Sequence, residues 1–254
     1  GLGALGFVDD WLKVSKKNSK GVSSRGKLAV QWVVGLAAGY VLYNLPSQDG
    51  YFAHLQLPFI KREFFEVHDM GWFTVVFFAV VIVGCSNAVN LTDGLDGLAA
   101  GCTVSAALAY GVFCYVTGNV KIASYLNIEH NVYAGELVPL CFGLIGASVG
   151  FLWFNCFPAR VFMGDTGSMA IGGCLAAVAI CCKQEVVLLL AGGVFVEAVL
   201  DWDAEHFEGA YRLLAQFTRD VVGGEIEVAA LVDRHRRLAG HQRLEVEELD
   251  VGGD

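Results

Sequence analysis

Three short acidic motifs interrupt an otherwise apolar chain, and each lies where a hydrophobic run ends. They read D-D-W-L-K at residues 9–13, N-L-T-D-G-L-D-G at residues 90–97 and F-M-G-D-T-G-S at residues 162–168. A carboxylate at the edge of a bilayer is costly to keep without a partner, so acids in such places indicate a functional site. Five acids in three clusters predict a functional site more strongly than a single acid would.

The first motif combines two acids with a lysine at helical spacing. In a helix, Lys13 can reach both Asp9 and Asp10, four and three residues before it. An ordinary helix-end ion pair would explain this spacing equally well. Lys17 lies four residues after Lys13, however, and two like charges at that spacing repel unless an anion lies between them. A phosphate, as substrate or as membrane headgroup, is such an anion.

The second motif places three polar side chains in register. Asn90, Asp93 and Asp96 recur every three residues, which stacks an amide and two carboxylates along one side of a helix or a broken helix. Gly94 and Gly97 allow a bulky ligand to approach closely. Oxygen ligands of this kind suit a hard cation, above all Mg²⁺. The alternative is that one of the two acids caps the helix that follows, which would explain one acid but not the register.

The third motif precedes another expected helix. Asp165 or Ser168 could be its N-cap. Asn155 and Arg160 lie just upstream, and a guanidinium suits phosphate recognition more than capping. A loop that leads into a helix N-terminus is itself an anion site. Together the motifs supply acids for a divalent metal and cations for phosphates, which is the inventory of phosphoryl transfer.

The elements that must position these motifs are membrane helices. The 254 residues are 55% hydrophobic with a mean hydropathy of +0.54, which excludes an ordinary soluble domain. A membrane-spanning helix needs about 20 apolar residues. Apolar runs near that length cover residues 28–45, 71–91, 98–117 and 137–157, with shorter runs at 167–182 and 186–200 and a helix end at 1–8. We predict an all-α polytopic transmembrane helix bundle of about six to seven membrane elements, followed by a polar C-terminal tail.

Cysteines and basic residues add two expectations. The eight cysteines show no C-x-x-C pair, so we expect buried, reduced thiols. The loop after the first motif is strongly basic, which marks it as cytoplasmic. Counting spans forward brings all three motifs to the cytoplasmic face and leaves residues 183–185 outside. The basic residues of that loop are Lys13, Lys16, Lys17, Lys20, Arg25 and Lys27.

The motifs G-F-V-D-D-W-L-K, N-L-T-D-G-L-D-G-L-A and F-P-A-R-V-F-M-G-D-T-G-S resemble those of the bacterial phospho-N-acetylmuramoyl-pentapeptide transferases, within the polyprenyl-phosphate sugar-1-phosphate transferase superfamily. The resemblance covers about residues 1–198. It implies a multi-pass bacterial inner-membrane enzyme of peptidoglycan synthesis that requires Mg²⁺. Its substrates would be UDP-MurNAc-pentapeptide and undecaprenyl phosphate, and its products lipid I and UMP.

The resemblance also implies residue roles. Asp165 matches the family's metal-binding aspartate. Asp9 and Asp10 match its paired aspartates, one of which is proposed to deprotonate or position the lipid phosphate. Asn90, Asp93, Asp96 and Asn155 match the family's polar substrate and metal shell, and we predict a catalytic role for Asp93. The predicted substrate-binding residues are Lys13, Lys17, Asn90, Asp96, Asn155 and Arg160.

Several alternatives stay open. The lipid phosphate could attack the sugar-linked phosphorus directly, which we favour, or Asp9 or Asp10 could form a covalent phospho-aspartate. The donor could be UDP-GlcNAc instead. A transporter or channel lined by acids is a different class, and a non-catalytic remnant is a third. A homodimer is compatible with the sequence, and no nucleic-acid partner is expected.

Residues 199–254 depart from the family. Residues 201–254 contain six arginines, no lysine and 13 acids, whereas the first 200 residues contain eight lysines and three arginines. The family has a loop with a histidine cluster in this region, and the tail contains no run of adjacent histidines. We interpret this tail as unrelated to the family, from a frameshift or gene-model artefact; amphipathic helices at 209–222 and 225–238 are the alternative. The chain is also expected to begin partway through a longer protein, so domain 1–198 would be incomplete and inactive or nearly so alone.

Overall fold

The computed structural model describes residues 1–16, 21–44, 51, 52, 55, 70–94, 96–126, 128–156 and 159–188. These all belong to the first of the chain's two units, residues 1–197. The predicted tail at 199–254 and most of the predicted span at 186–200 lie outside them. Every regular element in the described part is a helix, so the all-α prediction is confirmed. The elements are α1 (Leu2–Ser15), α2 (Ser24–Tyr43), α3 (Phe73–Thr92), α4 (Leu98–Gly118), α5 (Val120–Leu126), η2 (Val132–Leu137), α6 (Val138–Asn155) and α7 (Gly164–Cys181).

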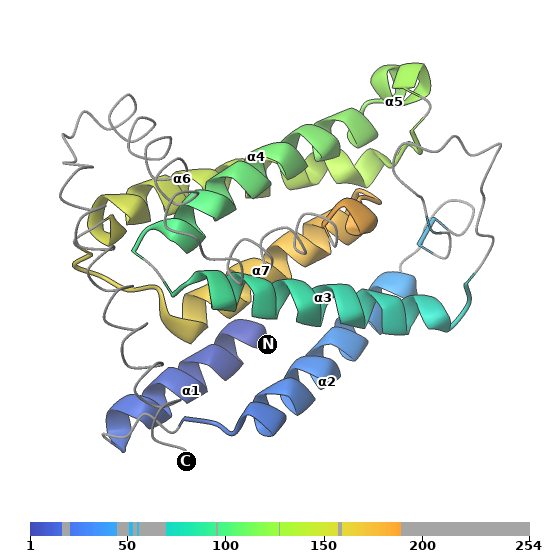
Figure 1. Cartoon of the computed structure of the whole chain (residues 1–254). Helices are drawn as coiled ribbons and strands as arrows, with labels where there is room; N and C mark the ends of the chain where they lie inside the picture. The colour runs from blue at the N-terminus through green and yellow to red at the C-terminus, as the bar shows by residue number, and fades with distance from the viewer. Residues whose placement is uncertain are drawn as a thin grey trace, which may run out of the picture. The chain divides into compact units, whose positions relative to one another are not determined.

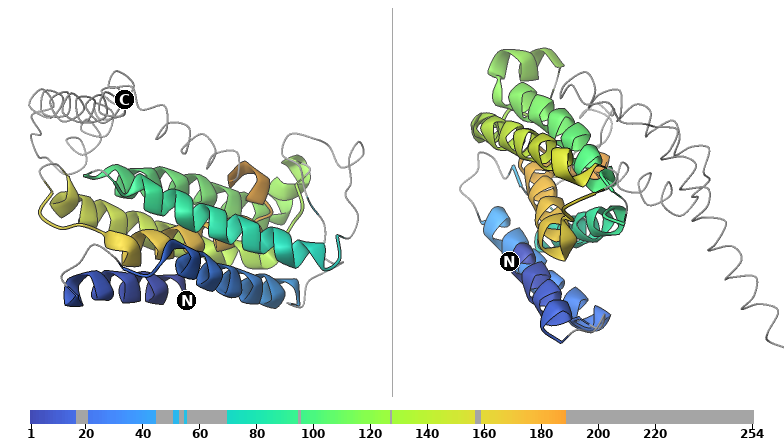
Figure 2. Two further views of the ribbon diagram at one scale, coloured as in Figure 1. Left: turned by 60° about the horizontal axis from the view of Figure 1, so that its bottom comes forward. Right: turned by 90° about the vertical axis from the view of Figure 1, so that its left-hand side faces the viewer.

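Helices α3 and α7 form the centre of the bundle. Helices α1 and α2 lie on one side of this pair, and α4 and α6 lie on the other (Figure 1). The turned views show the same order (Figure 2). The most extensive packing joins α3 to α7, α4 to α6, α2 to α3 and α1 to α7. Since α1 packs on α7, the first and third acidic motifs come together although they lie far apart in the sequence.

Four helical segments in the described part are long and apolar enough to cross a membrane. They are α3, α4, the continuous η2–α6 segment Val132–Asn155, and α7. The polytopic bundle is thereby confirmed. Helix α2, predicted as a span from residue 28 onward, is as long as α3 but is not among the four. Its Lys27 and Gln31 make it more polar, and both take part in the contacts described below.

Local signals in the sequence set the helix ends. The Ser23 hydroxyl accepts a hydrogen bond from the Gly26 N–H at 3.2 Å and thereby caps α2. Pro139 lies in the first turn of α6, where a missing N–H costs nothing. Gly97 precedes α4 with a φ of +78°, a conformation that glycine adopts without strain. The connection from α3 to α4 can therefore turn sharply beside the second motif.

The core is built from small and apolar side chains. At Gly172 of α7, an added Cβ would lie 2.6 Å from the Cys85 carbonyl oxygen, so α3 and α7 approach each other at a glycine. Phe78, Met169 and Ile180 are fully buried around this contact line. All eight cysteines are free, as the sequence predicted, but only Cys114, Cys141 and Cys182 are buried, so the expectation of buried thiols is wrong for the other five, which are half-buried.

Candidate active site

Helix α1 presents the first motif where it packs on α7. Its buried residues include Leu2, Leu5, Gly6 and Asp9. A Cβ added at Gly6 would collide with the backbone carbonyl of Asp165. Glycine at this position therefore lets the two helices come close enough for their acids to meet.

Asp10 caps α7 from outside that helix. Its Oδ2 accepts hydrogen bonds from the Thr166 backbone N–H at 3.0 Å and the Thr166 hydroxyl at 2.8 Å. The first N–H groups of a helix have no partner within it, so an external carboxylate satisfies one of them. The alternative that Asp165 or Ser168 is the N-cap is wrong, because the N-cap is Met163 and makes no side-chain cap bond.

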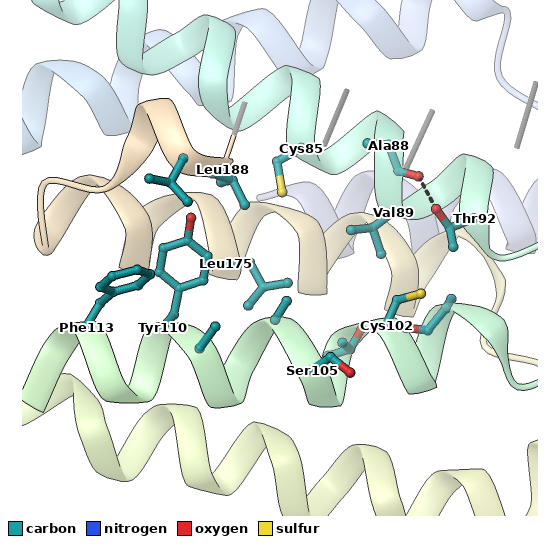
Figure 3. A pocket seen from close by; sticks show the side chains of 15 residues that line it. Cys85, Ala88, Val89, Thr92, Cys102, Ser105, Tyr110, Phe113, Leu175 and Leu188 are labelled. Carbon is teal, nitrogen blue, oxygen red and sulfur yellow. Dashed lines mark hydrogen bonds between the residues drawn. The ribbon is translucent and has the colours of Figure 1, made fainter. Parts of the chain in front are cut away.

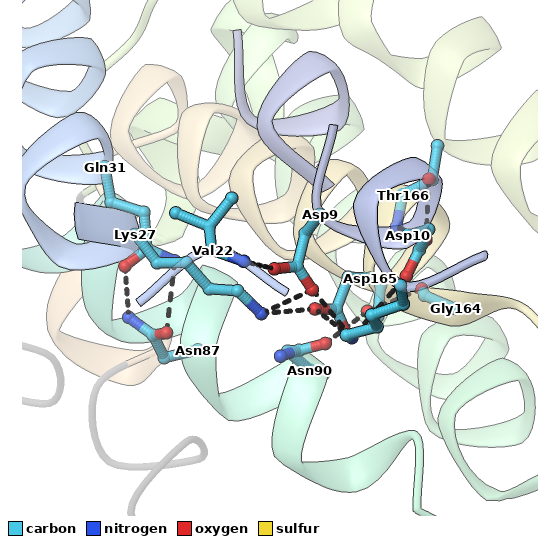
Figure 4. Close-up of polar contacts among 12 residues, drawn as sticks. Asp9, Asp10, Val22, Lys27, Gln31, Asn87, Asn90, Gly164, Asp165 and Thr166 are labelled. Atoms are coloured by element: carbon cyan, nitrogen blue, oxygen red, sulfur yellow. Dashed lines mark hydrogen bonds and ion pairs between the residues drawn. The ribbon is translucent and has the colours of Figure 1, made fainter. Parts of the chain in front are cut away.

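Two ammonium groups join the acids of α1 and α7 (Figure 4). The Lys13 Nζ lies 2.6 Å from Asp9 Oδ2, 3.2 Å from Asp165 Oδ2 and 3.7 Å from Asp10 Oδ1. The Lys27 Nζ lies 2.8 Å from Asp9 Oδ2 and 2.6 Å from Asp165 Oδ2. The predicted reach of Lys13 to both acids of its motif is confirmed. The cluster of Asp9, Asp10, Asp165, Lys13 and Lys27 is called the aspartate–lysine cluster below.

Sequence reasoning missed Lys27 as a site residue and counted it only as a basic charge of the loop. A signal for it was present. Ser23 marks a helix start, which places Lys27 near the positive N-terminal end of that helix, where a cation is unfavourable without an anionic partner. Lys17, which was predicted to bind phosphate with Lys13, lies outside the described residues.

The electrostatics of the cluster favour ionised side chains at its centre. Burial alone would raise the pKa of Asp9, but hydrogen bonds from Lys13 and Lys27 outweigh it and hold that pKa far below its usual value. The hydrogen bond to Asp9 raises the pKa of Lys13. Burial would lower the pKa of Lys27, but hydrogen bonds to Asp165 and Asp9 leave it raised. Asp93 differs, because burial and then the charge of Asp165 raise its pKa to about 6, close to neutral pH.

Asn90 and Asp93 meet the third motif at the end of α3. The Asn90 Oδ1 accepts a hydrogen bond from the Ser168 hydroxyl at 2.8 Å. Asp93, the C-cap of α3, lies close enough to the start of α7 for the Gly164 backbone and the charge of Asp165 to influence its pKa. The predicted polar row therefore lies on a broken helix, and its first two members contact the start of α7.

Asp96 and Asn155 tie the neighbouring loops together. The Asp96 Oδ2 accepts a hydrogen bond from the Ala159 N–H at 3.0 Å. The Asn155 Oδ1 accepts one from the Gly97 N–H at 3.0 Å, and its Nδ2 donates to the Val161 carbonyl at 2.8 Å. Both side chains hold the backbone around the second and third motifs, and their predicted contact with substrate stays a prediction.

Neither acid of the second motif caps α4, and Arg160 lies on the surface. The alternative that Asp93 or Asp96 caps α4 is wrong, because the N-cap is Gly97 in a left-handed conformation that aspartate would adopt only at a cost. Arg160 is exposed beside the third motif. Its predicted role at a phosphate stays a prediction.

The three aspartates fit a divalent cation. One carboxylate oxygen from each of Asp9, Asp10 and Asp165 lies within 4.8 Å of the others. In the part of the chain that the structure describes, no other trio of acidic, histidine or cysteine side chains is this close. Hard carboxylate oxygens suit Mg²⁺, which usually combines one or two of them with substrate phosphates. The predicted ligand Asp165 thus lies beside two further candidate ligands.

An apolar cavity of about 250 Å³ lies between α3, α4 and α7 (Figure 3). Leu175, Phe113 and Leu188 are among its apolar lining residues. The Thr92 hydroxyl, also in the lining, donates to the Ala88 carbonyl of its own helix at 2.8 Å. Since Thr92 directly precedes the second motif's first acid, this hydrocarbon-like surface extends from the polar end of the bundle into its interior.

Comparisons with known proteins agree with this arrangement. The model of the family described as Glycosyl transferase family 4 matches residues 1–183. The chain is 49% identical over 195 residues to a phospho-N-acetylmuramoyl-pentapeptide-transferase of Methylacidiphilum infernorum, covering 77% of this chain and 53% of the relative. It is 50% identical over 199 residues to the Desulfotalea psychrophila protein of that name, covering 78% and 54%. A third relative with this name, from Citrifermentans bemidjiense, is 49% identical over 201 residues, covering 79% and 54%. The chain thus spans about half the length of the curated relatives it matches.

Proposed function

The chain belongs to glycosyl transferase family 4, and we propose that it transfers phospho-N-acetylmuramoyl-pentapeptide from UDP to undecaprenyl phosphate, forming lipid I and UMP. The observation that carries the proposal is the aspartate–lysine cluster. It combines a carboxylate trio for a divalent cation with two ammonium groups for phosphates. The names of the relatives supply the substrate class.

The chain's own residues would act mainly by positioning and by neutralising charge, as phosphoryl transfer requires. An oxygen of the lipid phosphate bonds to the sugar-linked phosphorus, and the bond from that phosphorus to the bridging oxygen breaks, so that UMP leaves. Lys13 and Lys27 would stabilise the phosphate oxygens as charge shifts. Asp9, Asp10 and Asp165 would hold Mg²⁺, which when bound neutralises pyrophosphate charge.

Direct attack fits the contacts of the paired aspartates better than a covalent intermediate does, because both carboxylates already accept hydrogen bonds. The side chain of Asp9 is 0% exposed and already accepts a hydrogen bond from the Val22 N–H at 2.6 Å. The Asp10 Oδ2 is held by Thr166 at the start of α7. A carboxylate nucleophile would have to give up contacts of this kind to attack the phosphorus. Failure to trap a phospho-enzyme when lipid phosphate is omitted would support direct attack.

The membrane setting is part of the proposal. The basic loop after the first motif favours a cytoplasmic orientation of the cluster. The apolar cavity between α3, α4 and α7 is suited to part of an isoprenoid chain, whose phosphate would then lie near the second motif. Labelling of a Lys16→Cys variant by a membrane-impermeant thiol reagent should require permeabilised cells.

A transfer assay in detergent tests the proposed function. The 254-residue chain is used in excess over UDP-MurNAc-pentapeptide, with undecaprenyl phosphate and Mg²⁺ present, so that even a single turnover is detected. We expect UMP release that requires the lipid phosphate and the metal and that is lost in Asp165→Asn. Equal or faster release from UDP-GlcNAc would reassign the donor. Ion flux in proteoliposomes without nucleotide chemistry would favour the transporter class.

A further inference from the structure

A reciprocal pair of side-chain amides connects α2 to α3 (Figure 4). The Gln31 Nε2 donates to the Asn87 Oδ1 at 3.1 Å, and the Asn87 Nδ2 donates to the Gln31 Oε1 at 3.0 Å. The Asn87 Nδ2 also donates to the Val83 carbonyl at 2.9 Å, which fixes the orientation of that amide. Gln31 is 1% exposed. A buried amide is costly unless it is hydrogen-bonded, so each partner holds the other in place.

The other fully buried residues of α2 are glycines. The buried residues of α2 are Gln31, Gly35 and Gly39, which follow one another at intervals of one helical turn. A Cβ added at Gly39 would lie 2.8 Å from the Val75 carbonyl oxygen. A glycine face allows close approach, and the apolar side chains beside it, Val34, Ala38 and Leu42, pack against the core without directional bonds. The bond to Asn87 is therefore well placed to set the register of the two helices.

Lys27 lies one turn before Gln31 on α2 and depends on this register. One helical turn corresponds to about 5.4 Å along the axis. The Lys27 Nζ lies 2.8 Å from Asp9 Oδ2 and 2.6 Å from Asp165 Oδ2. Sliding α2 along its axis would move the base of the Lys27 side chain relative to both acids and disfavour the geometry that bridges them.

We propose that Gln31 and Asn87 are positioning residues whose amide pair fixes α2 against α3 so that Lys27 bridges Asp9 and Asp165. Any role of Lys27 at a substrate phosphate rests on the proposed function. Its placement between the two carboxylates does not. The competing explanation is that the amide pair contributes only general packing.

Zero-length cross-linking of the full 254-residue chain measures the placement directly. A water-soluble carbodiimide activates a carboxyl group, and an amine in contact displaces the urea and leaves an amide bond. Mass spectrometry of peptides then gives the yield of the Lys27–Asp165 cross-link relative to the Lys13–Asp165 cross-link. Both lysines contact the same carboxylate, but Lys13 comes from α1, so its cross-link is an internal control.

The decisive variant is Gln31→Leu/Asn87→Leu, which removes both amides together and leaves neither unpaired. We expect the Lys27 cross-link to fall at least about tenfold relative to the Lys13 cross-link. The rate of a reaction between two groups that the protein holds together falls steeply as the distance between them grows. The exchange variant Gln31→Asn/Asn87→Gln keeps the summed length of the pair and should restore the wild-type ratio. Thr103→Val is the matched control, since it removes a buried hydrogen bond within α4, 2.7 Å to the Ala99 carbonyl, without touching α2.

An unchanged ratio in the double leucine variant would overturn the proposal. Equal loss of both cross-links would also overturn it, because that result assigns the amide pair to general packing. So would an exchange variant that loses the Lys27 cross-link as fully as the leucine variant does. The assay needs neither substrate nor turnover, so failure of the transfer reaction would not change its outcome.

Discussion

Two charged clusters lie at opposite ends of α7 and differ in how far water reaches them. At the start of the helix, Asp165 shares two lysines with Asp9, and the lysine side chains are 36% and 22% exposed. Just beyond its end, Lys183 pairs with Glu185 at 3.7 Å, and their side chains are 1% and 0% exposed. The first cluster is open to solvent, as our proposal of a metal and phosphate site requires. The second is closed to solvent.

Aromatic rings close the second cluster. The Lys183 Nζ lies 5.5 Å from the ring centres of Tyr51 and Phe78 and 5.9 Å from that of Phe52. It also donates to the Phe52 carbonyl at 3.4 Å. Rings at this distance attract a cation through their negative faces and exclude water. Charge alone therefore does not distinguish the two clusters, whereas access from solvent does.

The largest expected effect is a difference between the two clusters in their contribution to metal affinity. Asp165→Asn should weaken binding of Mn²⁺, used as a paramagnetic substitute for Mg²⁺, by on the order of 100-fold or more, because it removes a carboxylate from the trio. Electron paramagnetic resonance of the chain in detergent measures the free ion. Glu185→Gln is the matched control and should leave the Mn²⁺ affinity unchanged. Equal losses in the two variants would contradict the assignment of the metal site.

The next effect is on stability and should appear at the other end of α7. Lys183→Met should lower the free energy of unfolding by about 3–5 kcal/mol, because it leaves Glu185 buried without its cation. Lys183→Met/Glu185→Leu should recover most of that loss. Lys27→Met should cost only about 1 kcal/mol, since its side chain is partly exposed and Lys13 remains beside Asp9. Denaturant titrations in detergent give all three values, and a double variant as unstable as the single one would refute the explanation.

The sequence predicted the helices and the local contacts better than the long-range ones. The apolar runs predicted α3, α4, α6 and α7, and spacing predicted the reach of Lys13 to its own motif. Motif order could not reveal that Asp10 caps α7, because that contact depends on how α1 packs on a distant helix. The same holds for Lys27, which enters the cluster from α2.

Residues 183–185 are a second case in which the sequence did not predict a long-range contact. The sequence placed them in an outer loop, where charges are ordinarily solvated. The structure instead buries Lys183 and Glu185, and the rings of Tyr51, Phe52 and, from α3, Phe78 lie around the Lys183 ammonium group. Burial of a loop charge depends on which distant segment covers it, and hydropathy along one segment does not carry that information.

A smaller effect concerns the helix contact that holds the first cluster together. Gly6→Ala should destabilise the chain by about 1–3 kcal/mol and weaken Mn²⁺ binding, because the new methyl group pushes α1 away from Asp165. Gly143→Ala on α6 is the matched control, since nothing lies within 4 Å of its added Cβ. This control should be neutral or more stable by up to about 1 kcal/mol, because alanine favours helix over glycine. An effect of Gly6→Ala no larger than that of the control would show that the close approach does not matter.

The smallest effect is a difference in pH dependence between acids of the two clusters. Burial raises the pKa of Glu185 above its usual 4.5, so the folded protein holds that proton more tightly than the unfolded chain does. Its contribution to stability is therefore present below pH 4.5 and is lost as the pH rises through the folded-state pKa, with a slope of at most about 1.4 kcal/mol per pH unit. Asp9 has the opposite sign, because its lowered pKa gives stability that is present above its usual 3.8 and is lost only as the pH falls well below that value. Unfolding free energies measured from pH 4.5 upward should thus fall more steeply in the wild type than in Glu185→Gln. Parallel curves would mean that the carboxyl group of Glu185 is not buried in the folded protein as described.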